Sequence, residues 1–160
     1  MNELAAPVLR RAAMDFLARR EHSQHELKHK LLLKFPQINE VSLNEVLVQL
    51  KAENLQSDSR FTESYTRFRK NKGFGYLHIK RELELKRVQP DIISEYLNPD
   101  HIDWISIATL VLKKKMRGTK AVFIKQKEYS KLVWYLQNRG FIHRQIDLAM
   151  QSLVDSDYVR

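Results

Sequence analysis

The chain has 160 residues, and its 28 Lys and Arg against 19 Asp and Glu give a formal net charge of +9, so we expect an acidic partner. Cysteine is absent, which excludes disulfides, Cys-ligated zinc, iron–sulfur clusters and thiol nucleophiles. Glycine and proline contribute four residues each, and this scarcity disfavours turn-rich sandwiches and barrels and favours helices.

Apolar residues in the first third of the chain recur at the spacing of three amphipathic helices. The first and third helices carry apolar residues through i, i+4 and i+7, and the shorter second helix carries an i, i+4 pair. These positions are Leu9, Ala13 and Phe16, then Leu27 and Leu31, then Leu43, Val46, Leu47 and Leu50.

The same patterns return twice, each time about 52 residues further along the chain. The second set is Phe61, Tyr65 and Phe68, then Ile79 and Leu83, then Ile93, Tyr96 and Leu97. The third set is Trp104, Ala108 and Val111, then Leu132 and Leu136, then Ile146, Ala149, Met150 and Leu153. We therefore predict an all-α fold of nine helices. They form three tandem three-helix repeats, residues 1–57, 58–100 and 101–160, stacked in an elongated, curved array.

Local signals predict where several helices begin. Ser23 with Glu26 and Ser42 with Glu45 have the spacing of a capping box, in which hydroxyl and carboxylate satisfy free amides at a helix start. Asp58 is expected to cap the fourth helix, and the neighbouring Arg60 is expected to be structural.

The third repeat is longer than the others by about eight residues, which we interpret as a basic, mobile insertion at residues 113–127. Eight basic residues against one acidic residue lie between Lys113 and Lys131, and eight against two lie between Arg67 and Arg87. These two patches account for most of the net charge, whereas residues 1–57 are nearly neutral.

Signals for export and for membrane insertion are missing. No apolar run follows a basic start at the N-terminus, and no stretch approaches the roughly 18 apolar residues of a membrane span. We therefore expect a cytoplasmic protein with no membrane partner.

Residues 25–29 read H-E-L-K-H, the spacing at which two His on a helix bind zinc and the Glu acts as general base. Because Leu27 and Leu31 face the core, both His should point to solvent, about 200° around the helix from Leu27. We therefore expect no zinc site in this segment. We also expect that the chain is not an enzyme and has no catalytic residue, metal or cofactor. A zinc hydrolase that uses His25, Glu26 and His29 is kept as a third alternative.

Residues 72–76 read K-G-F-G-Y, and the two glycines permit a sharp turn between helices. The Walker and dinucleotide patterns are both missing, which disfavours a nucleotide-binding loop. Basic side chains beside Phe74 and Tyr76 suit a nucleic-acid backbone and its bases, and the alternative is a solvated charged face. A sequence-specific helix-turn-helix reader is disfavoured because the third helices of the first two repeats are acidic or neutral.

The middle of the chain carries a more specific pattern than periodicity alone. It consists of Asp58-Ser59-Arg60-Phe61, Tyr65, Arg69, Lys72-Gly73-Phe74-Gly75, Ile79 and Glu82-Leu83. This pattern resembles the signature of the RecX regulatory proteins, which bind bacterial RecA. Residues 13–23, 26–27 and 30–31 are similar to the family's opening, and residues 102–104, 135–136 and 139–141 resemble its C-terminal third. One departure is Arg87, where many relatives have Gly, so the turn after the fifth helix can differ in shape.

The resemblance implies a non-enzymatic regulator built from three three-helix repeats. Members of this family bind the RecA filament on single-stranded DNA, lie in its groove and suppress its ATPase, strand exchange and coprotease activities. We therefore expect negative regulation of RecA, which modulates recombination, DNA repair and the SOS response. The expected partners are the RecA nucleoprotein filament and single-stranded DNA, and the chain is expected to act as a monomer. The alternative is a general single-stranded nucleic-acid-binding helical module without RecA as target.

The expected contact residues come from the two basic patches. The candidates are Arg69, Lys70, Lys72, Gly73, Gly75, Lys80 and Arg81 around the glycine turn, and Lys113, Lys114, Lys115 and Arg117 from the insertion.

Overall fold

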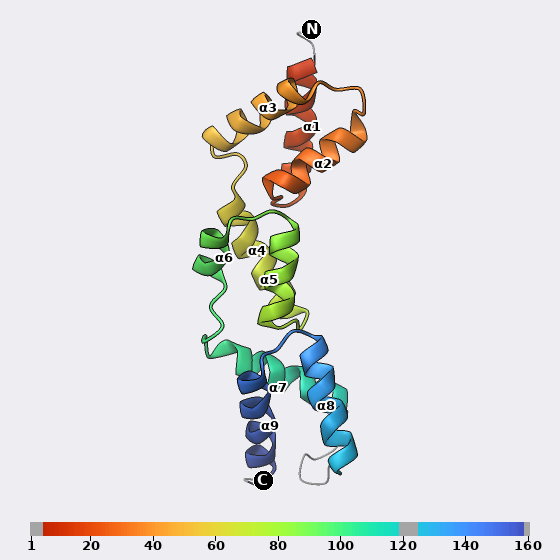
Figure 1. The fold of residues 1–160 in the computed structure, drawn as a ribbon, viewed down its shortest axis with the longest axis vertical. Helices are drawn as coiled ribbons and strands as arrows, with labels where there is room; N and C mark the ends of the chain where they lie inside the picture. The colour runs from red at the N-terminus through yellow and green to blue at the C-terminus, as the bar shows by residue number, and fades with distance from the viewer. Residues whose placement is uncertain (1–4, 119–124, 159–160) are drawn as a thin grey trace. The chain divides into compact units, whose positions relative to one another are not determined.

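The computed structural model describes residues 5–118 and 125–158, and within these ranges it contains nine α-helices and no strand (Figure 1). The helices are α1 Ala5–Arg19, α2 Gln24–Lys34, α3 Glu40–Ala52, α4 Asp58–Asn71, α5 Tyr76–Leu85, α6 Pro90–Tyr96, α7 Asp103–Met116, α8 Gln126–Asn138 and α9 His143–Tyr158. The predicted all-α fold is confirmed. None of the described helices has both the length and the apolar character that a membrane crossing requires.

The chain divides into two compact units. Unit 1 consists of Met1–Tyr65 and Leu83–Tyr96, and unit 2 consists of Thr66–Glu82 and Leu97–Arg160. The boundaries of the three sequence repeats stay a prediction, and so does their elongated, curved stacking. Each unit is described below by itself.

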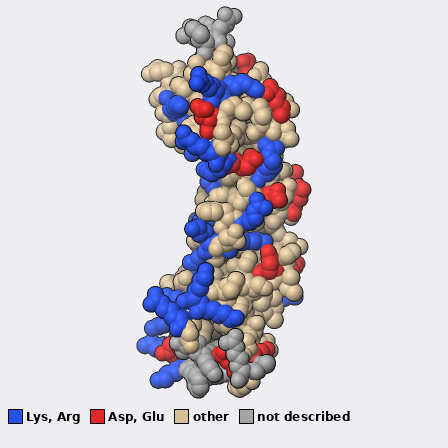
Figure 2. All heavy atoms as spheres, turned by 180° about the vertical axis from the view of Figure 1, so that it is seen from behind, with Lys and Arg blue, Asp and Glu red and all other residues tan. Residues whose placement is uncertain are grey.

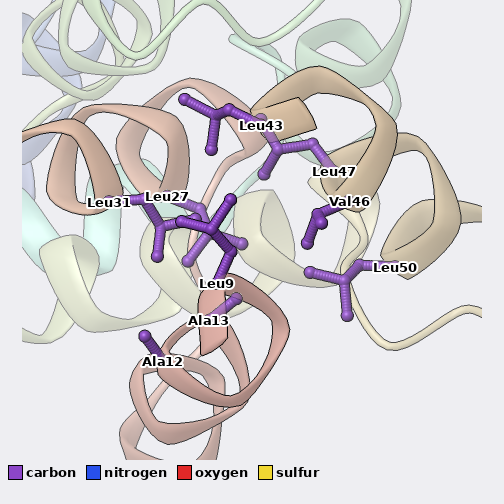
Figure 3. Close-up of a cluster of buried hydrophobic side chains, with 9 residues drawn as sticks. All are labelled: Leu9, Ala12, Ala13, Leu27, Leu31, Leu43, Val46, Leu47 and Leu50. Carbon is purple, nitrogen blue, oxygen red and sulfur yellow. The ribbon is translucent and has the colours of Figure 1, made fainter. Parts of the chain in front are cut away.

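The core of unit 1 is built from the apolar faces of α1, α2 and α3, whose side chains point toward one another in Figure 3. All nine of its central residues are at most 5% exposed. They are Leu9, Ala12, Ala13, Leu27, Leu31, Leu43, Val46, Leu47 and Leu50. Because burying one Leu or Val side chain contributes roughly 1.5–3 kcal/mol, this cluster is the main source of stability for the three helices.

The core of unit 2 is centred on Trp104 in α7, which is fully buried and whose indole N–H donates to the Asn98 carbonyl at 2.7 Å. Leu136 of α8 and Ile146 of α9 are fully buried as well. Gln145 is a buried polar residue in this core, and its side chain donates to the Pro99 carbonyl at 2.8 Å and accepts from the Ile142 amide at 3.1 Å. The spacing predicted for these three helices is therefore confirmed.

One predicted core position is wrong. Phe68 of α4 is 51% exposed, although Phe61, seven residues earlier, is 1% exposed. The buried face of α4 instead includes Thr62 and Thr66, which lie one and five residues after Phe61. Next to Phe68, the Arg69 side chain is 19% exposed and pairs with Glu82, so a charged residue and not the phenyl ring is the more buried of the two.

The capping prediction at Ser23 is half confirmed. Its hydroxyl accepts from the Glu26 amide at 3.1 Å, so Ser23 is the N-cap of α2. The Glu26 carboxylate, however, pairs with Arg20 at 3.1 Å and with Lys86 at 2.6 Å. Burial would raise the pKa of Glu26, but the hydrogen bonds and charges of Arg20 and Lys86 outweigh burial and lower it.

The other two capping predictions are wrong. Helix α3 begins at Glu40, two residues before Ser42, because the Asn39 side chain accepts from the Val41 amide at 2.8 Å and takes the N-cap position. Asp58 is the first residue of α4, and it is Ser57 whose hydroxyl accepts from the Arg60 amide at 3.2 Å. A residue already inside the first turn cannot be the N-cap.

The Asp58 carboxylate instead accepts from the Gln24 amide at the start of α2 and from the Gln56 side chain, both at 2.9 Å. Arg60 is structural as expected. Its guanidinium donates to Glu21 at 2.9 Å and to the side chain and carbonyl of Asn54 at 2.8 and 2.9 Å. These contacts hold the beginning of α4 against the ends of α1 and α3 within unit 1.

Candidate functional site

The turn between α4 and α5 is held against the turn that follows α8, within unit 2. The Gly75 amide donates to the Arg139 carbonyl at 2.7 Å, and the Leu77 amide donates to the Gly140 carbonyl at 2.8 Å. A Cβ at Gly75 would overlap the backbone of Gly140 and Phe141, so only glycine allows this approach. Gly73 has φ +80°, in the left-handed region that favours glycine. The two glycines therefore fix the shape of the turn.

Arg139 closes the end of α4 from the opposite side. Its guanidinium donates to the carbonyls of Gly73 and Lys72 at 2.7 and 2.6 Å, and it lies 4.5 Å from the centre of the Phe74 ring. Carbonyl groups at a helix end lack partners within the helix, so these bonds satisfy acceptors that the turn leaves open. Within the described residues, no carboxylate pairs with Arg139, and the positive charge is not neutralised.

Two of the predicted contact residues are engaged in ion pairs. Arg69 donates to both carboxylate oxygens of Glu82 at 2.8 and 2.7 Å and lies 3.9 Å from the Phe74 ring centre. Lys70 donates to Asp103 at 2.8 Å and lies 4.3 Å from the Trp104 ring centre. Both side chains are 19% exposed, so their first role is to hold α4 in place.

The pKa of Asp103 is affected by its ion pair with Lys70. Burial would raise the pKa of Asp103, but the hydrogen bonds and charges of Lys70 and His101 lower it below its usual value. The carboxylate is therefore ionised at neutral pH and compensates the charge of Lys70.

A groove of about 590 Å³ opens beside the α4–α5 turn. It is lined by the end of α4, by α7, and by Tyr135 and Arg139 at and just after the end of α8. We call it the basic groove. Its cationic residues are Lys70, Lys72, Lys114, Lys115, Arg117 and Arg139. No acidic residue lines it within the described part of the chain. Figure 2 shows a dense group of Lys and Arg side chains at the lower left, over α7 and α8 of unit 2.

The basic groove joins residues from the two patches that the sequence separates. Lys72 comes from the patch at the glycine turn, and Lys114, Lys115 and Arg117 come from the patch that begins at Lys113. The periodic pattern could not reveal this, because the groove depends on how α4 and α7 pack.

The structure places the beginning of the basic insertion in a helix. Lys113, Lys114 and Lys115 form the last turn of α7, and Arg117 follows in a left-handed conformation with φ 49°. Cations are favoured at this end of a helix because its carbonyl groups carry partial negative charge. Successive residues of a helix point in different directions, and Lys113 does not line the groove. Residues 119–124 of the predicted insertion lie outside the described residues.

Other candidates lie away from the groove. Lys80 is half-buried and Arg81 is exposed, and neither residue lines it. Tyr135 and Arg139 line the groove although charge clustering did not select them. Arg139 donates to the Tyr135 hydroxyl at 3.3 Å, and Lys115 lies 4.8 Å from the centre of the Tyr135 ring. Two signals in the sequence pointed to them: the i, i+4 spacing at the end of α8, and the resemblance of residues 135–136 and 139–141 to the RecX family.

The H-E-x-x-H segment has the orientation predicted for it. His25 and His29 are exposed, and their rings stack with centres 6.2 Å apart. The Glu26 carboxylate is turned away into its ion pairs with Arg20 and Lys86. Within the described residues, no three His, Asp or Glu side chains are placed to share a metal ion.

Nine described helices and a groove lined by six cations define an all-α protein with a strongly basic surface. Residues 57–97 match the family model of the second three-helix domain of RecX. The chain is 37% identical over 157 residues to the regulatory protein RecX of Vibrio campbellii, covering 97% of this chain and 98% of the relative. It is 39% identical over 134 residues to that of Mannheimia succiniciproducens, covering 81% and 83%. The chain therefore belongs to the RecX family of regulatory proteins.

Solved structures agree on the fold. The crystal structure of RecX from Lactobacillus salivarius aligns with a TM-score of 0.77 at 22% identity, over 94% of this chain and 97% of that chain. A second crystal structure of regulatory protein RecX aligns with a TM-score of 0.74 at 19% identity, over 91% and 73%.

Proposed function

We propose that this chain is a negative regulator of RecA that binds the filament formed by RecA on single-stranded DNA. It inhibits ATP hydrolysis, strand exchange and coprotease activity, and so modulates recombination, DNA repair and the SOS response. Membership of the RecX family supports this proposal. The chain acts as a cytoplasmic monomer, without catalysis of its own.

The observation that carries the proposal is the basic groove. Five of its cationic side chains, those of Lys72, Lys114, Lys115, Arg117 and Arg139, have no carboxylate partner within the described residues. Unpaired cations in a concave surface raise the local concentration of an acidic partner and speed its encounter. A nucleoprotein filament offers phosphates and acidic side chains together, so a groove of this kind suits it.

The test is RecA ATPase activity on single-stranded DNA, with the purified chain added in molar excess over filament ends. We expect hydrolysis to fall. A variant with Lys72→Gln, Lys114→Gln and Arg117→Gln should inhibit more weakly, because three exposed groove cations are lost.

The matched control carries Arg11→Gln, Arg19→Gln and Lys51→Gln in α1 and α3, where three exposed cations are removed away from the groove. This control should inhibit like the unmodified chain. Unchanged hydrolysis with the unmodified chain would end the proposal, and equal loss in both variants would exclude the groove as the contact surface.

A second candidate function is a general single-stranded nucleic-acid-binding module without RecA as target. Tyr135 favours it, since an aromatic ring among cations is typical of surfaces that hold unpaired nucleic acid. Fluorescence anisotropy of a labelled single strand, bare and coated with RecA, discriminates the two. A preference for the coated strand supports the RecA regulator, and equal affinity supports the module.

A further inference from the structure

Trp134 of α8 is a large apolar side chain left in solvent, with 66% of its surface exposed. It lies on the opposite face of α8 from the buried Leu132 and Leu136. The other tryptophan of the chain, Trp104, is fully buried. Exposing an indole gives no stability to the folded chain, so a binding role accounts for it better than packing does.

The surroundings of Trp134 are cationic. Lys127, Lys131 and Trp134 stand at i, i+4 and i+7 on one face of α8, and both Lys residues are exposed. Together with Gln126 and Ser130 they line a shallow depression of about 560 Å³, with no acidic residue among them. We call these five residues the Trp134 patch.

The Trp134 patch and the basic groove share α8. Tyr135, the residue after Trp134, lines the groove together with Arg139. Consecutive helical residues are separated by about 100° around an axis of roughly 10–12 Å diameter, so one strand of nucleic acid can pass from one surface to the other.

We propose that Trp134 stacks on a base of single-stranded DNA whose phosphates are bound by Lys127, Lys131 and the basic groove. The inference rests on the proposed function and names the part of unit 2 that touches the DNA. Charge complementarity favours single-stranded DNA as the ligand of the Trp134 patch. Trp134 is the single large apolar residue of a patch that has two cations, which matches alternating bases and phosphates. A protein partner that docks by apolar contact would need a wider apolar surface.

Tryptophan fluorescence tests the proposal directly. The full chain is titrated with oligothymidylate of about 16 nucleotides, and binding is followed in parallel by anisotropy of a labelled oligonucleotide. Since Trp104 is buried, quenching by a stacked base reports on Trp134. We expect quenching that saturates together with the anisotropy change.

Three variants complete the test. Trp134→Ala should lower affinity for the oligonucleotide by about 5- to 100-fold, because one base stack is lost. Trp134→Phe should retain most of the affinity while losing the quenching signal. The control Leu33→Ala truncates a 72% exposed side chain in α2 and should bind normally. Unchanged urea midpoints confirm that each variant is folded.

Oligonucleotide binding without quenching, or equal affinity of Trp134→Ala and the unmodified chain, would overturn the inference. Quenching by RecA alone and not by the oligonucleotide would overturn it as well, since the patch would then bind protein. The two proposals fail separately. If the proposed function fails, the unmodified chain leaves RecA ATPase unchanged, whereas if only this inference fails, inhibition persists and Trp134 does not respond to DNA.

Discussion

His22 lies between α1 and α2 with 1% of its surface exposed. Its Nδ1 is 3.0 Å from the Arg20 carbonyl, and its Nε2 has no hydrogen-bond partner among the described residues. Burial lowers the pKa of His22 below its ordinary value of 6.5, and the charges of Arg20 and Lys30 lower it further. The Arg20 carbonyl and the Glu26 charge act in the opposite direction without reversing the shift. At neutral pH the imidazole of His22 in the folded chain is therefore uncharged.

A neutral His22 makes the stability of unit 1 depend on pH. Below about pH 6.5 the unfolded chain binds a proton at His22 that the folded chain resists, so the free energy of unfolding falls as pH decreases. The His22 contribution is fully present above pH 6.5 and changes by at most about 1.4 kcal/mol per pH unit. Urea unfolding at pH 7.5 and 5.5 should show a larger loss in the unmodified chain than in His22→Asn. An identical loss in both would contradict the argument.

Charge counting at single residues predicted the basic regions but not which cations remain available. Arg69 and Lys70 look in the sequence like Lys72, yet their carboxylate partners lie 13 and 33 residues further along. Arg139, with no basic neighbour before it, was selected by no charge run. The packing of α4 against α5 and α7 determines which cations stay unpaired. A local sequence pattern carries no information about this packing.

At the scale of helices and turns, periodicity predicted most of the buried faces, because a helix repeats its orientation every 3.6 residues whatever it packs against. Its errors are local. Phe68 is exposed because Thr62 and Thr66 contribute to the buried face of α4, and Ser42 is not a cap because Asn39 caps the helix earlier. The close approach at Gly75 was beyond prediction, since the opposing Gly140 is 65 positions away in sequence.

Gly75→Ala should disrupt the α4–α5 turn. The new Cβ would overlap the backbone of Gly140 and Phe141, which cannot move as a side chain can, so we expect a loss of about 2–3 kcal/mol in unfolding free energy. The control is Gly118→Ala, where a Cβ meets nothing within 4 Å and the left-handed φ of +86° alone costs about 1 kcal/mol. Urea denaturation measures both, and equal losses would contradict the close approach.

In the turn after α5, Arg87 adopts a backbone conformation that favours glycine. Arg87 has φ +57°, a left-handed conformation that costs a residue with a Cβ about 1–2 kcal/mol. Arg87→Gly relieves this strain but adds freedom to the unfolded chain, so the net gain should be about 0.5–1 kcal/mol. Thermal unfolding at fixed protein concentration checks this, and a destabilised Arg87→Gly variant would show that the Arg side chain makes a compensating contact.

At the scale of the molecule, charge is concentrated rather than spread. The sequence places +6 of the net charge in residues 101–160, and the basic groove collects cations from the end of α4, from α7 and from the end of α8. A ligand that neutralises several of them releases the counterions of its phosphates, which makes affinity fall with salt. We therefore expect the salt dependence of the proposed binding to come from the groove as a whole.

For single strands the slope of log affinity against log salt changes by about 0.7 for each phosphate contact. The variant with Lys72→Gln, Lys114→Gln and Arg117→Gln should therefore show a slope shallower by about 2 than that of the unmodified chain. Anisotropy between 50 and about 200 mM salt measures it. The variant with Arg11→Gln, Arg19→Gln and Lys51→Gln has the same net charge, and an equal change in its slope would assign the effect to bulk charge.

Arg139 has two roles. It lines the basic groove, and it donates to the carbonyls of Lys72 and Gly73 just after the end of α4. Under the proposed function, ligand affinity and the stability of the α4–α5 turn therefore depend on the same side chain. A lysine there would keep the charge but could not reproduce the planar fork that spans two carbonyls. Binding defects at this position are consequently pleiotropic, and they identify a ligand contact only after the folding contribution has been subtracted.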